Sequence, residues 1–266
     1  MKLFRYAILP VLLVSLLLSC ETVPITGRSQ LSLVSDQQLN GLAFDSYKEF
    51  LSKNKLSTNV AETQRVKRVG LRIQNAVTQF FKQNGQYERI ADYKWEFNLV
   101  EGKEMNAWCM PGGKVVVYTG ILPVTRDDAG LAVVMGHEIA HAVAGHGKER
   151  MSQGLLTEMG GAALSVALSE QGAATRSLFL GAYGVGTQVG VLLPYSRLHE
   201  SEADRLGLIF MAMAGYDPHT AVDFWQRMAQ SKQGGAPPEI LSTHPADRAR
   251  IENIRNHIPE AMSYRN

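Results

Sequence analysis

The stretch Met135-Gly136-His137-Glu138-Ile139-Ala140-His141-Ala142 lies within an apolar run that extends from Leu131 to Val143. The length and composition of this run predict a buried helix. Because each residue of an α-helix turns the chain by ~100°, two histidines four positions apart lie one above the other on the same face. Two imidazoles in this arrangement can bind one Zn²⁺ at ~2.0–2.1 Å each, and a glutamate beside them can deprotonate a water molecule. We therefore predict a zinc site with His137 and His141 as ligands and Glu138 as the general base.

A zinc site built on two histidines needs a third protein ligand, with one position left for water. The stretch from Arg197 to Ala214 (RLHESEADRLGLIFMAMA) has a helical pattern that ends at Gly215, and we expect Glu200 to be the third ligand. Asp204 lies one turn further on the same face, where its carboxylate can hold a ligating histidine by the other ring nitrogen. Glu202 points about 200° away from both and is expected to be a solvated charge.

His244 is a further histidine that we expect to act at the site. It lies in Ser242-Thr243-His244-Pro245, where Pro245 is a good first residue for the last helix and the histidine side chain can reach into a cleft. It can donate a hydrogen bond to an oxyanion that forms when water attacks, or bind the metal and hold the site shut, or only begin the helix. Three other histidines are expected at the surface: His199, His219 and His257. His146 is expected in the C-terminal turn of the metal-binding helix, pointing to the side opposite His137.

The first 19 residues are predicted to be a lipoprotein signal peptide. Lys2 and Arg5 precede an apolar stretch of 12 residues, Ala7 to Leu18, which is too short for a membrane-spanning helix. The sequence continues to Ser19-Cys20, and its end resembles the motif at which bacterial lipoproteins are cleaved, so Cys20 is the expected lipidation site. A plain signal peptide that happens to end in cysteine is the alternative. Residues 20–35 are predicted to be a polar tether.

The rest of the chain predicts one α+β domain over residues 36–266, mostly helical, with a small β-sheet beside the metal-binding helix. The expected segments before that helix are two helices, over 36–47 and 59–81, and three strands, over 93–99, 105–110 and 114–119. Pro111-Gly112-Gly113 is expected to join the last two strands as a hairpin. Thr125 and Asp128 resemble a capping box at the start of the metal-binding helix. The Gly-rich stretch 151–195 is expected to form helical pieces and linkers near the site.

Three blocks of the sequence carry a resemblance to a known family: His137-Glu138-x-x-His141, then Glu200-x-Glu202-Ala203-Asp204, then Thr243-His244-Pro245. In this order they resemble the HtpX/BepA/Oma-type zinc metalloendopeptidases, and the chain is most similar to small bacterial lipoprotein peptidases of the outer membrane. The resemblance implies a zincin-type peptidase domain with one Zn²⁺ per chain, Glu200 as the third ligand and Asp204 as its supporting carboxylate. It also implies that Asn106 and Ala107 belong to an edge strand along which the substrate lies, and that His244 faces the metal.

The expected activity is peptide-bond hydrolysis by a membrane-tethered zinc metalloendopeptidase that acts on extended or misfolded envelope proteins as quality control. The resemblance and the N-terminal motif predict a location in the bacterial cell envelope, lipid-anchored to the outer membrane and facing the periplasm. The expected partners are unfolded polypeptides and the membrane, whereas the net charge of +2 without a basic stripe excludes nucleic acid. The alternative is a non-catalytic lipoprotein that uses zinc only to fold and binds misfolded clients or assembly partners. Glu138 argues against it, because a structural zinc site needs no base.

Overall fold

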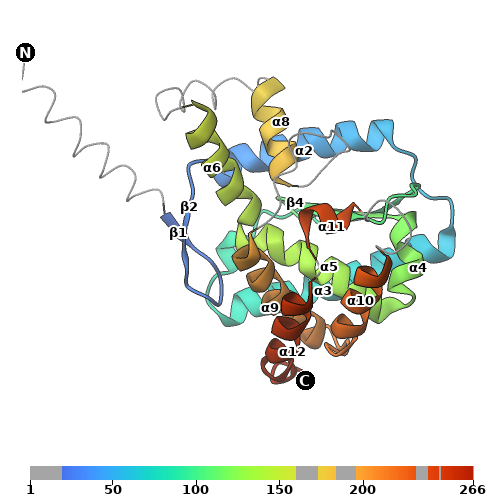
Figure 1. Ribbon diagram of the computed structural model, residues 1–266. Coiled ribbons are helices and arrows are strands. Elements are labelled where there is room, and N and C mark those ends of the chain that lie inside the picture. The colour runs from blue at the N-terminus through green and yellow to red at the C-terminus, as the bar shows by residue number, and fades with distance from the viewer. Residues whose placement is uncertain (1–19, 160–172, 184–195, 232–238, 246, 266) are drawn as a thin grey trace, which may run out of the picture.

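The H-E-x-x-H stretch forms helix α5 (Asp128–Ala144), which lies at the centre of the molecule and is buried from Gly130 to its end (Figure 1). The computed structural model describes residues 20–159, 173–183, 196–231, 239–245 and 247–265, so the predicted signal peptide lies outside the described residues. Among the described helices, α5 makes its most extensive contact with α9 (Arg197–Met213). Two further helices pack against α5: α3 (Val60–Gln83) and α10 (Thr220–Gln230).

A three-stranded sheet lies beside α5. Its order is β3 (Glu96–Val100), β5 (Lys114–Tyr118) and β4 (Ala107–Met110), with β5 parallel to β3 and antiparallel to β4. The hairpin predicted over Pro111-Gly112-Gly113 is confirmed, since Met110 pairs with Lys114. β4 is therefore an edge strand, and it packs directly against the metal-binding helix.

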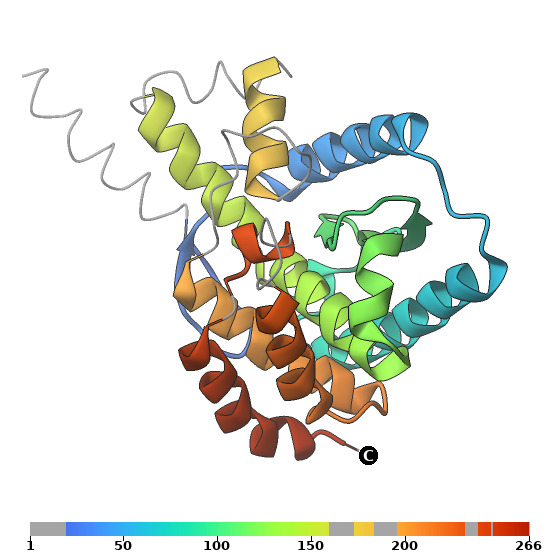
Figure 2. The same cartoon turned by 45° about the vertical axis from the view of Figure 1, so that its right-hand side comes forward.

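The two faces of this sheet belong to different hydrophobic cores, because alternate side chains of a strand point to opposite faces. Val115 and Val117 of β5 join the core of α3 and α5, whereas Val116 between them joins a second core. Three helices supply the second core and cover that face (Figure 2), namely α2 (Asp36–Lys53), α6 (His146–Met159) and α8 (Ala173–Ala182). The predicted α+β architecture, mostly helical with a small sheet beside the metal-binding helix, is confirmed.

Two helices begin later than their sequences predict. Asp127 is the N-cap of α5, because its carboxylate accepts a backbone N–H bond at 2.8 Å, while Thr125 belongs to the preceding short helix α4 (Leu122–Thr125). The last helix, α12 (Arg248–Met262), packs against α9 and starts after Pro245 rather than at it. The remaining short elements are η1 (Tyr87–Arg89), η2 (Thr119–Ile121) and α11 (Ile240–Thr243).

Residues 20–35 differ from the polar tether that their composition predicts. They form an antiparallel hairpin of two short strands, β1 (Cys20–Thr22) and β2 (Ser29–Leu31). Val23 and Val34 are each only 1% exposed, and the side chain of Gln30 donates a 2.9 Å hydrogen bond to the carbonyl of Ala144 at the end of α5. The segment is folded onto the domain because its few apolar side chains and Gln30 find partners there. We call it the N-terminal hairpin.

None of the helices that the structure describes is long and apolar enough to cross a bilayer. Of the Gly-rich stretch 151–195, the structure describes the end of α6 and helix α8, and the expected linkers lie outside the described residues.

Candidate metal centre

Two glycines allow α5 and α9 to approach closely. Gly136 lies on α5 next to His137, and Gly207 faces it from α9. A Cβ atom on Gly207 would lie 3.0 Å from the backbone nitrogen of His137, which is closer than an ordinary van der Waals contact. This tight crossing brings the polar side chains of one helix within reach of those of the other.

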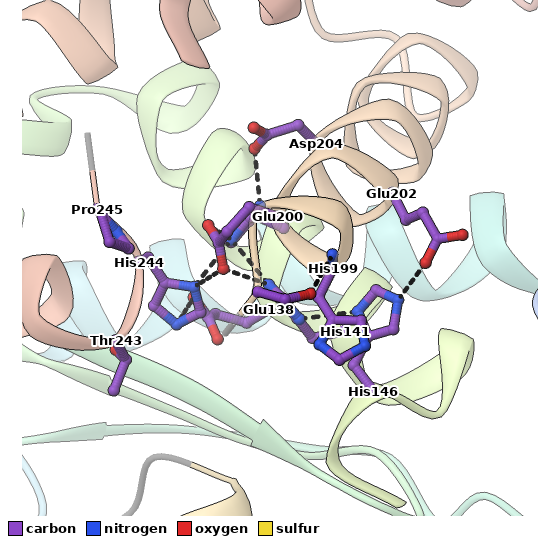
Figure 3. Close-up of polar contacts among 12 residues, drawn as sticks. Glu138, His141, His146, His199, Glu200, Glu202, Asp204, Thr243, His244 and Pro245 are labelled. Carbon is purple, nitrogen blue, oxygen red and sulfur yellow. Dashed lines mark hydrogen bonds and ion pairs between the residues drawn. The ribbon is translucent and has the colours of Figure 1, made fainter. Parts of the chain in front are cut away.

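Four buried side chains place donor atoms within 4.8 Å of one another: His137, His141, Glu200 and His244. The Nε2 atoms of His137 and His141 are 3.1 Å apart, and they lie 3.4 and 3.3 Å from the carboxylate oxygens of Glu200. Nδ1 of His244 lies 2.8 Å from Glu200 Oε1 and 3.2 Å from His137 Nε2. Figure 3 shows His141, Glu200 and His244 converging from three different segments.

These distances fit one zinc ion. Two ligands of a tetrahedral Zn²⁺ at ~2.0–2.1 Å are themselves ~3.3 Å apart, close to the spacing of the nitrogen and oxygen donors here. Two imidazoles and a carboxylate also form a donor set found in catalytic zinc sites. Beside them, Oε1 of Glu138 is buried and makes no hydrogen bond within the described part of the chain, so this oxygen needs a partner such as water.

Asp204 and Arg250 contact the donor group directly. Oδ1 of Asp204 is 2.9 Å from Nδ1 of His137, as the sequence predicts for a carboxylate that orients this ring. Arg250 of α12 lies 2.8 Å from Asp204 and 2.7 Å from Glu200, and its guanidinium stacks 3.6 Å above the ring of Trp225. Burial alone would raise the pKa of Asp204, but Arg250 and His137 hold it below its usual value.

Sequence reasoning misses Arg250. Two carboxylates on the inward face of one helix require a counter-charge, because an unpaired buried charge is costly. Which of the 27 lysines and arginines supplies this charge depends on how the last helix packs, and no local pattern marks Arg250.

Glu138 is 4% exposed and points towards the donor group from α5. Its Oε1 lies 3.6 Å from Nε2 of His244. Burial raises the pKa of Glu138, and the neighbouring His244 and His137 offset part of this effect. A general base works best when its pKa approaches the operating pH, so both the position and the direction of this shift suit the predicted role.

His146 is buried beside the site, although the sequence predicts that it points to the opposite side of the helix. Its Nδ1 lies 2.9 Å from Nδ1 of His141. The expectation fails at Gly145, whose φ of 76° ends α5, so that His146 begins a new helix and faces the site instead of continuing the old one. Of the histidines predicted at the surface, His219 is exposed as expected and His257 is partly buried.

Glu202 and His199 are also buried, contrary to the sequence-based expectation. Glu202 accepts hydrogen bonds from His146 Nε2 at 3.2 Å and from Arg28 at 3.0–3.1 Å. Arg28 also binds Glu149, which accepts a 2.9 Å bond from His199. Helical periodicity predicts the face on which a residue lies, but the N-terminal hairpin covers this face of α9.

The two carboxyl groups that bind Arg28 have lowered pKa values. Burial alone would raise the pKa of Glu202, but hydrogen bonds from His146 and Arg28 lower it to about 2. The pKa of Glu149 falls to about 2 against the same effect of burial, because His199 and Arg28 donate to it. Burial lowers the pKa of His146 to about 4, so this ring is neutral near pH 7.

Asn106 and Ala107 lie at the start of the edge strand β4, and both are buried. Oδ1 of Asn106 accepts the N–H of Ala107 at 2.9 Å, and the Asn106 carbonyl accepts the N–H of Tyr118. Because hydrogen-bonded and non-hydrogen-bonded pairs alternate in an antiparallel ladder, the backbone groups of Ala107 and Cys109 point away from β5. The strand packs on α5, which carries the predicted base, and burial and the charge of Glu138 raise the pKa of the Cys109 thiol.

A buried helix carrying H-E-x-x-H, a glutamate from a second helix and an edge strand beside them define a zinc metallopeptidase. Residues 62–258 match the family model described as Peptidase family M48, and the chain belongs to this family. It is a zinc metalloendopeptidase, and the resemblance carried by its three sequence blocks is confirmed.

The chain is similar to metalloendopeptidases from eukaryotes and bacteria. It is 37% identical over 248 residues to the mitochondrial metalloendopeptidase OMA1 of Schizosaccharomyces pombe, a match that covers 91% of this chain and 67% of the relative. It is 32% identical over 254 residues to the mitochondrial metalloendopeptidase OMA1 of Homo sapiens, with 92% and 47% covered. The beta-barrel assembly-enhancing protease of Escherichia coli is 26% identical over 246 residues, with 90% and 47% covered. The chain thus spans about half the length of the human and bacterial relatives.

These comparisons contradict the localisation predicted from the sequence. The OMA1 proteins of fission yeast, cattle, budding yeast, human and Arabidopsis are all named as mitochondrial. The prediction of a lipoprotein in the bacterial outer membrane is therefore wrong by these matches. The prediction assigns to this chain the compartment of one bacterial branch of the family, whereas the relatives include both mitochondrial and bacterial proteins.

Proposed function

We propose that this peptidase cleaves extended or misfolded polypeptides and thereby serves protein quality control. The observation that carries the proposal is the convergence of His137, His141 and Glu200 with the buried carboxylate of Glu138 beside an edge strand. In the proposal, the two histidines and Glu200 hold one Zn²⁺, and Glu138 is the general base.

The side chains around the donor group have different proposed roles in the reaction. When bound, zinc lowers the pKa of a water molecule and polarises the scissile carbonyl. Glu138 takes the proton from the attacking water and passes it to the leaving amine. Asp204 accepts a hydrogen bond from Nδ1–H of His137, which leaves Nε2 of that ring for the metal. Arg250 balances the charges of Asp204 and Glu200 and holds both carboxylates in place.

The edge strand supports an extended substrate. The backbone groups of Ala107 and Cys109 point outward from the sheet, where a peptide can add as a further strand. Main-chain hydrogen bonds of this kind are insensitive to side-chain identity, so they favour unfolded chains over any particular sequence. Asn106 contributes by holding the N–H of Ala107 until a substrate carbonyl replaces its side-chain oxygen.

His244 is proposed to gate the site. Its Nδ1 lies within the donor group, 2.8 Å from Glu200 and 3.2 Å from His137, which supports binding to the metal more than it supports an oxyanion donor. The backbone N–H of His244 donates to the carbonyl of Ile240, so the ring lies at the C-terminal end of the short helix α11. A substrate would displace the ring and open the site.

Metal analysis and digestion of the purified chain test the proposal. We expect one zinc per chain, and faster digestion of a denatured protein than of the same protein folded. Glu138→Gln should retain the zinc and lose the digestion. Zinc without digestion by the wild-type chain would instead favour the non-catalytic binder of misfolded clients, against which membership of a peptidase family argues.

We also propose that Cys20 carries a lipid that tethers the domain to a membrane. The support is the Leu17-Leu18-Ser19-Cys20 motif, and Cys20 is the first residue of β1, so the tether would begin directly at the domain. Mass spectrometry of the N-terminal peptide should find the lipid, and Cys20→Ala should leave the membrane fraction. A variant that stays there would show that another segment anchors the chain.

A further inference from the structure

A row of buried and partly buried polar side chains connects His141 to the N-terminal hairpin. Its successive members are His146, Glu202 and Arg28, none of which takes part in the reaction proposed above. The Nδ1 atoms of His141 and His146 are 2.9 Å apart, His146 Nε2 is 3.2 Å from Glu202 Oε2, and Arg28 Nη2 is 3.0 Å from the same oxygen. Figure 3 shows His146 between His141 and Glu202.

The directions of the hydrogen bonds follow from the two ends of this row. An ionised carboxylate only accepts, so Nε2 of His146 carries a proton and donates it to Glu202. When Nε2 of His141 binds the metal, the proton of that ring lies on Nδ1, so His141 donates and Nδ1 of His146 accepts in the 2.9 Å contact between the two rings. Nε2 of His141 thereby faces His137 and Glu200 as an acceptor atom.

We propose that His146, Glu202 and Arg28 are positioning residues that hold His141 in the tautomer and orientation required for zinc. The N-terminal hairpin is thereby part of the metal centre. This inference rests on the proposed role of His141 as a metal ligand.

Arg28 holds the ring of His146 from two sides. Its guanidinium binds Glu202 directly, and it binds Glu149 at 2.8 and 3.0 Å. Glu149 accepts from His199, whose ring stacks on that of His146 with centroids 4.6 Å apart and an angle of 21°. Removal of this one guanidinium therefore loosens both the hydrogen bond and the stacking partner of His146.

Hydrogen bonds in the turn of the N-terminal hairpin fix the position of Arg28. The Arg28 carbonyl accepts the N–H of Val23 at 2.8 Å across the turn of the hairpin, and Thr26 in the same turn donates to Glu202 at 2.7 Å. The hairpin is thus attached to α9 here and to the end of α5 through Gln30.

The two histidines of α5 have supports of the same kind. His137 is backed by Asp204, which Arg250 holds from the last helix. His141 is backed by His146 and Glu202, which Arg28 holds from the opposite end of the chain. Hydrogen bonds behind a metal-binding histidine fix its tautomer and ring orientation, and their loss typically costs ~10–100-fold in metal affinity.

The tautomers can be measured directly in the wild-type protein. The full chain, labelled with ¹⁵N at histidine and loaded with zinc, is examined by long-range ¹⁵N–¹H correlation. We expect the protons of His141 on Nδ1 and of His146 on Nε2. A His146 ring with its proton on Nδ1 would overturn the inference, since it could then not accept from His141.

Zinc affinity provides the second test, by competition with a chromophoric chelator. Arg28→Gln should bind zinc ~10–100-fold more weakly, and Arg28→Lys should recover part of this loss. The matched control is Arg68→Gln, because Arg68 forms an ion pair of 2.9 Å with Asp128 at the other end of α5 and does not reach the metal centre. The control should bind zinc as tightly as the wild-type chain.

The outcomes separate this inference from the proposed function. Wild-type zinc affinity in folded Arg28→Gln would overturn the inference alone. A wild-type chain without zinc affinity would overturn both. If Arg28→Gln does not fold, the wild-type tautomers of His141 and His146 still decide.

Discussion

The close crossing of α5 and α9 predicts the effect of one added methyl group. In Gly207→Ala the new Cβ would lie 3.0 Å from the backbone nitrogen of His137 and 3.1–3.2 Å from the backbone of Gly136. All of these neighbours are main-chain atoms, so no side chain can rotate away. The two helices must therefore separate by a few tenths of an ångström.

The size of the effect follows from two opposing contributions. Overpacking of a tight interior contact costs roughly 1–3 kcal/mol, whereas replacing glycine by alanine in a helix contributes ~1 kcal/mol of stability. We expect a net loss of about 1 kcal/mol in the free energy of unfolding. The metal should respond more strongly, because metal–ligand distances tolerate only ~0.2 Å, and the separation moves Glu200 away from His137. Zinc binding should weaken by about tenfold.

Urea unfolding of the metal-free chain and chelator competition measure the two quantities. The matched control is Gly41→Ala in α2, where a Cβ would meet no atom within 4 Å. The control should gain up to ~1 kcal/mol of stability and keep its zinc affinity. If Gly207→Ala matched Gly41→Ala in both measurements, the crossing would not set the geometry of the metal centre.

Three further changes test the roles of individual side chains. Glu138→Gln should keep its zinc but lose at least ~100-fold in turnover, measured at equal zinc occupancy; near wild-type turnover would contradict its role as base. His244→Ala should be faster than the wild-type chain if the histidine gates the site, whereas a slower variant would support the oxyanion role and an unchanged rate would remove it from the site. Arg28→Gln should be less stable than wild type above pH ~4.3, where the carboxylates of Glu149 and Glu202 are ionised in both folded and unfolded chains. Because the pKa values of both glutamates in the folded wild-type chain are lowered to about 2, the difference in urea midpoint between the two chains should shrink as the pH falls from ~4.3 towards 2. A difference that stays constant over this range would contradict the ion pairing of Arg28 with Glu149 and Glu202.

The parts of the site that the sequence predicts are those that one helix specifies by itself. His137, Glu138 and His141 share an uninterrupted helix, and Glu200 and Asp204 share another, so their relative positions follow from 3.6 residues per turn. The alternating and turn residues around Pro111-Gly112-Gly113 likewise specify the β4–β5 hairpin.

The parts that the sequence does not predict depend on contacts between distant segments. His146 lies beyond the helix break at Gly145, where the periodicity of α5 no longer applies. Glu202 is buried because a hairpin 174 residues earlier in the chain covers it with Arg28, and Arg250 reaches the site only through the packing of α12 on α9. Arg28 of the predicted polar tether and Glu202, the predicted solvated charge, thus form one partly buried ion pair.

The separation of the two cores by the sheet gives the molecule distinct fluorescent reporters for each side. Trp108 lies in the core of α2 and α8, with its ring 4.9 Å from that of Phe50. Trp225 lies in the other core, stacked against Arg250 and 5.7 Å from the ring of His137. Because segments of a protein can open with different free energies, an emission change from Trp108 alone would report opening on the α2 side. A change from Trp225 would report the side that holds the metal, so variants retaining a single indole can establish which half of the peptidase opens first.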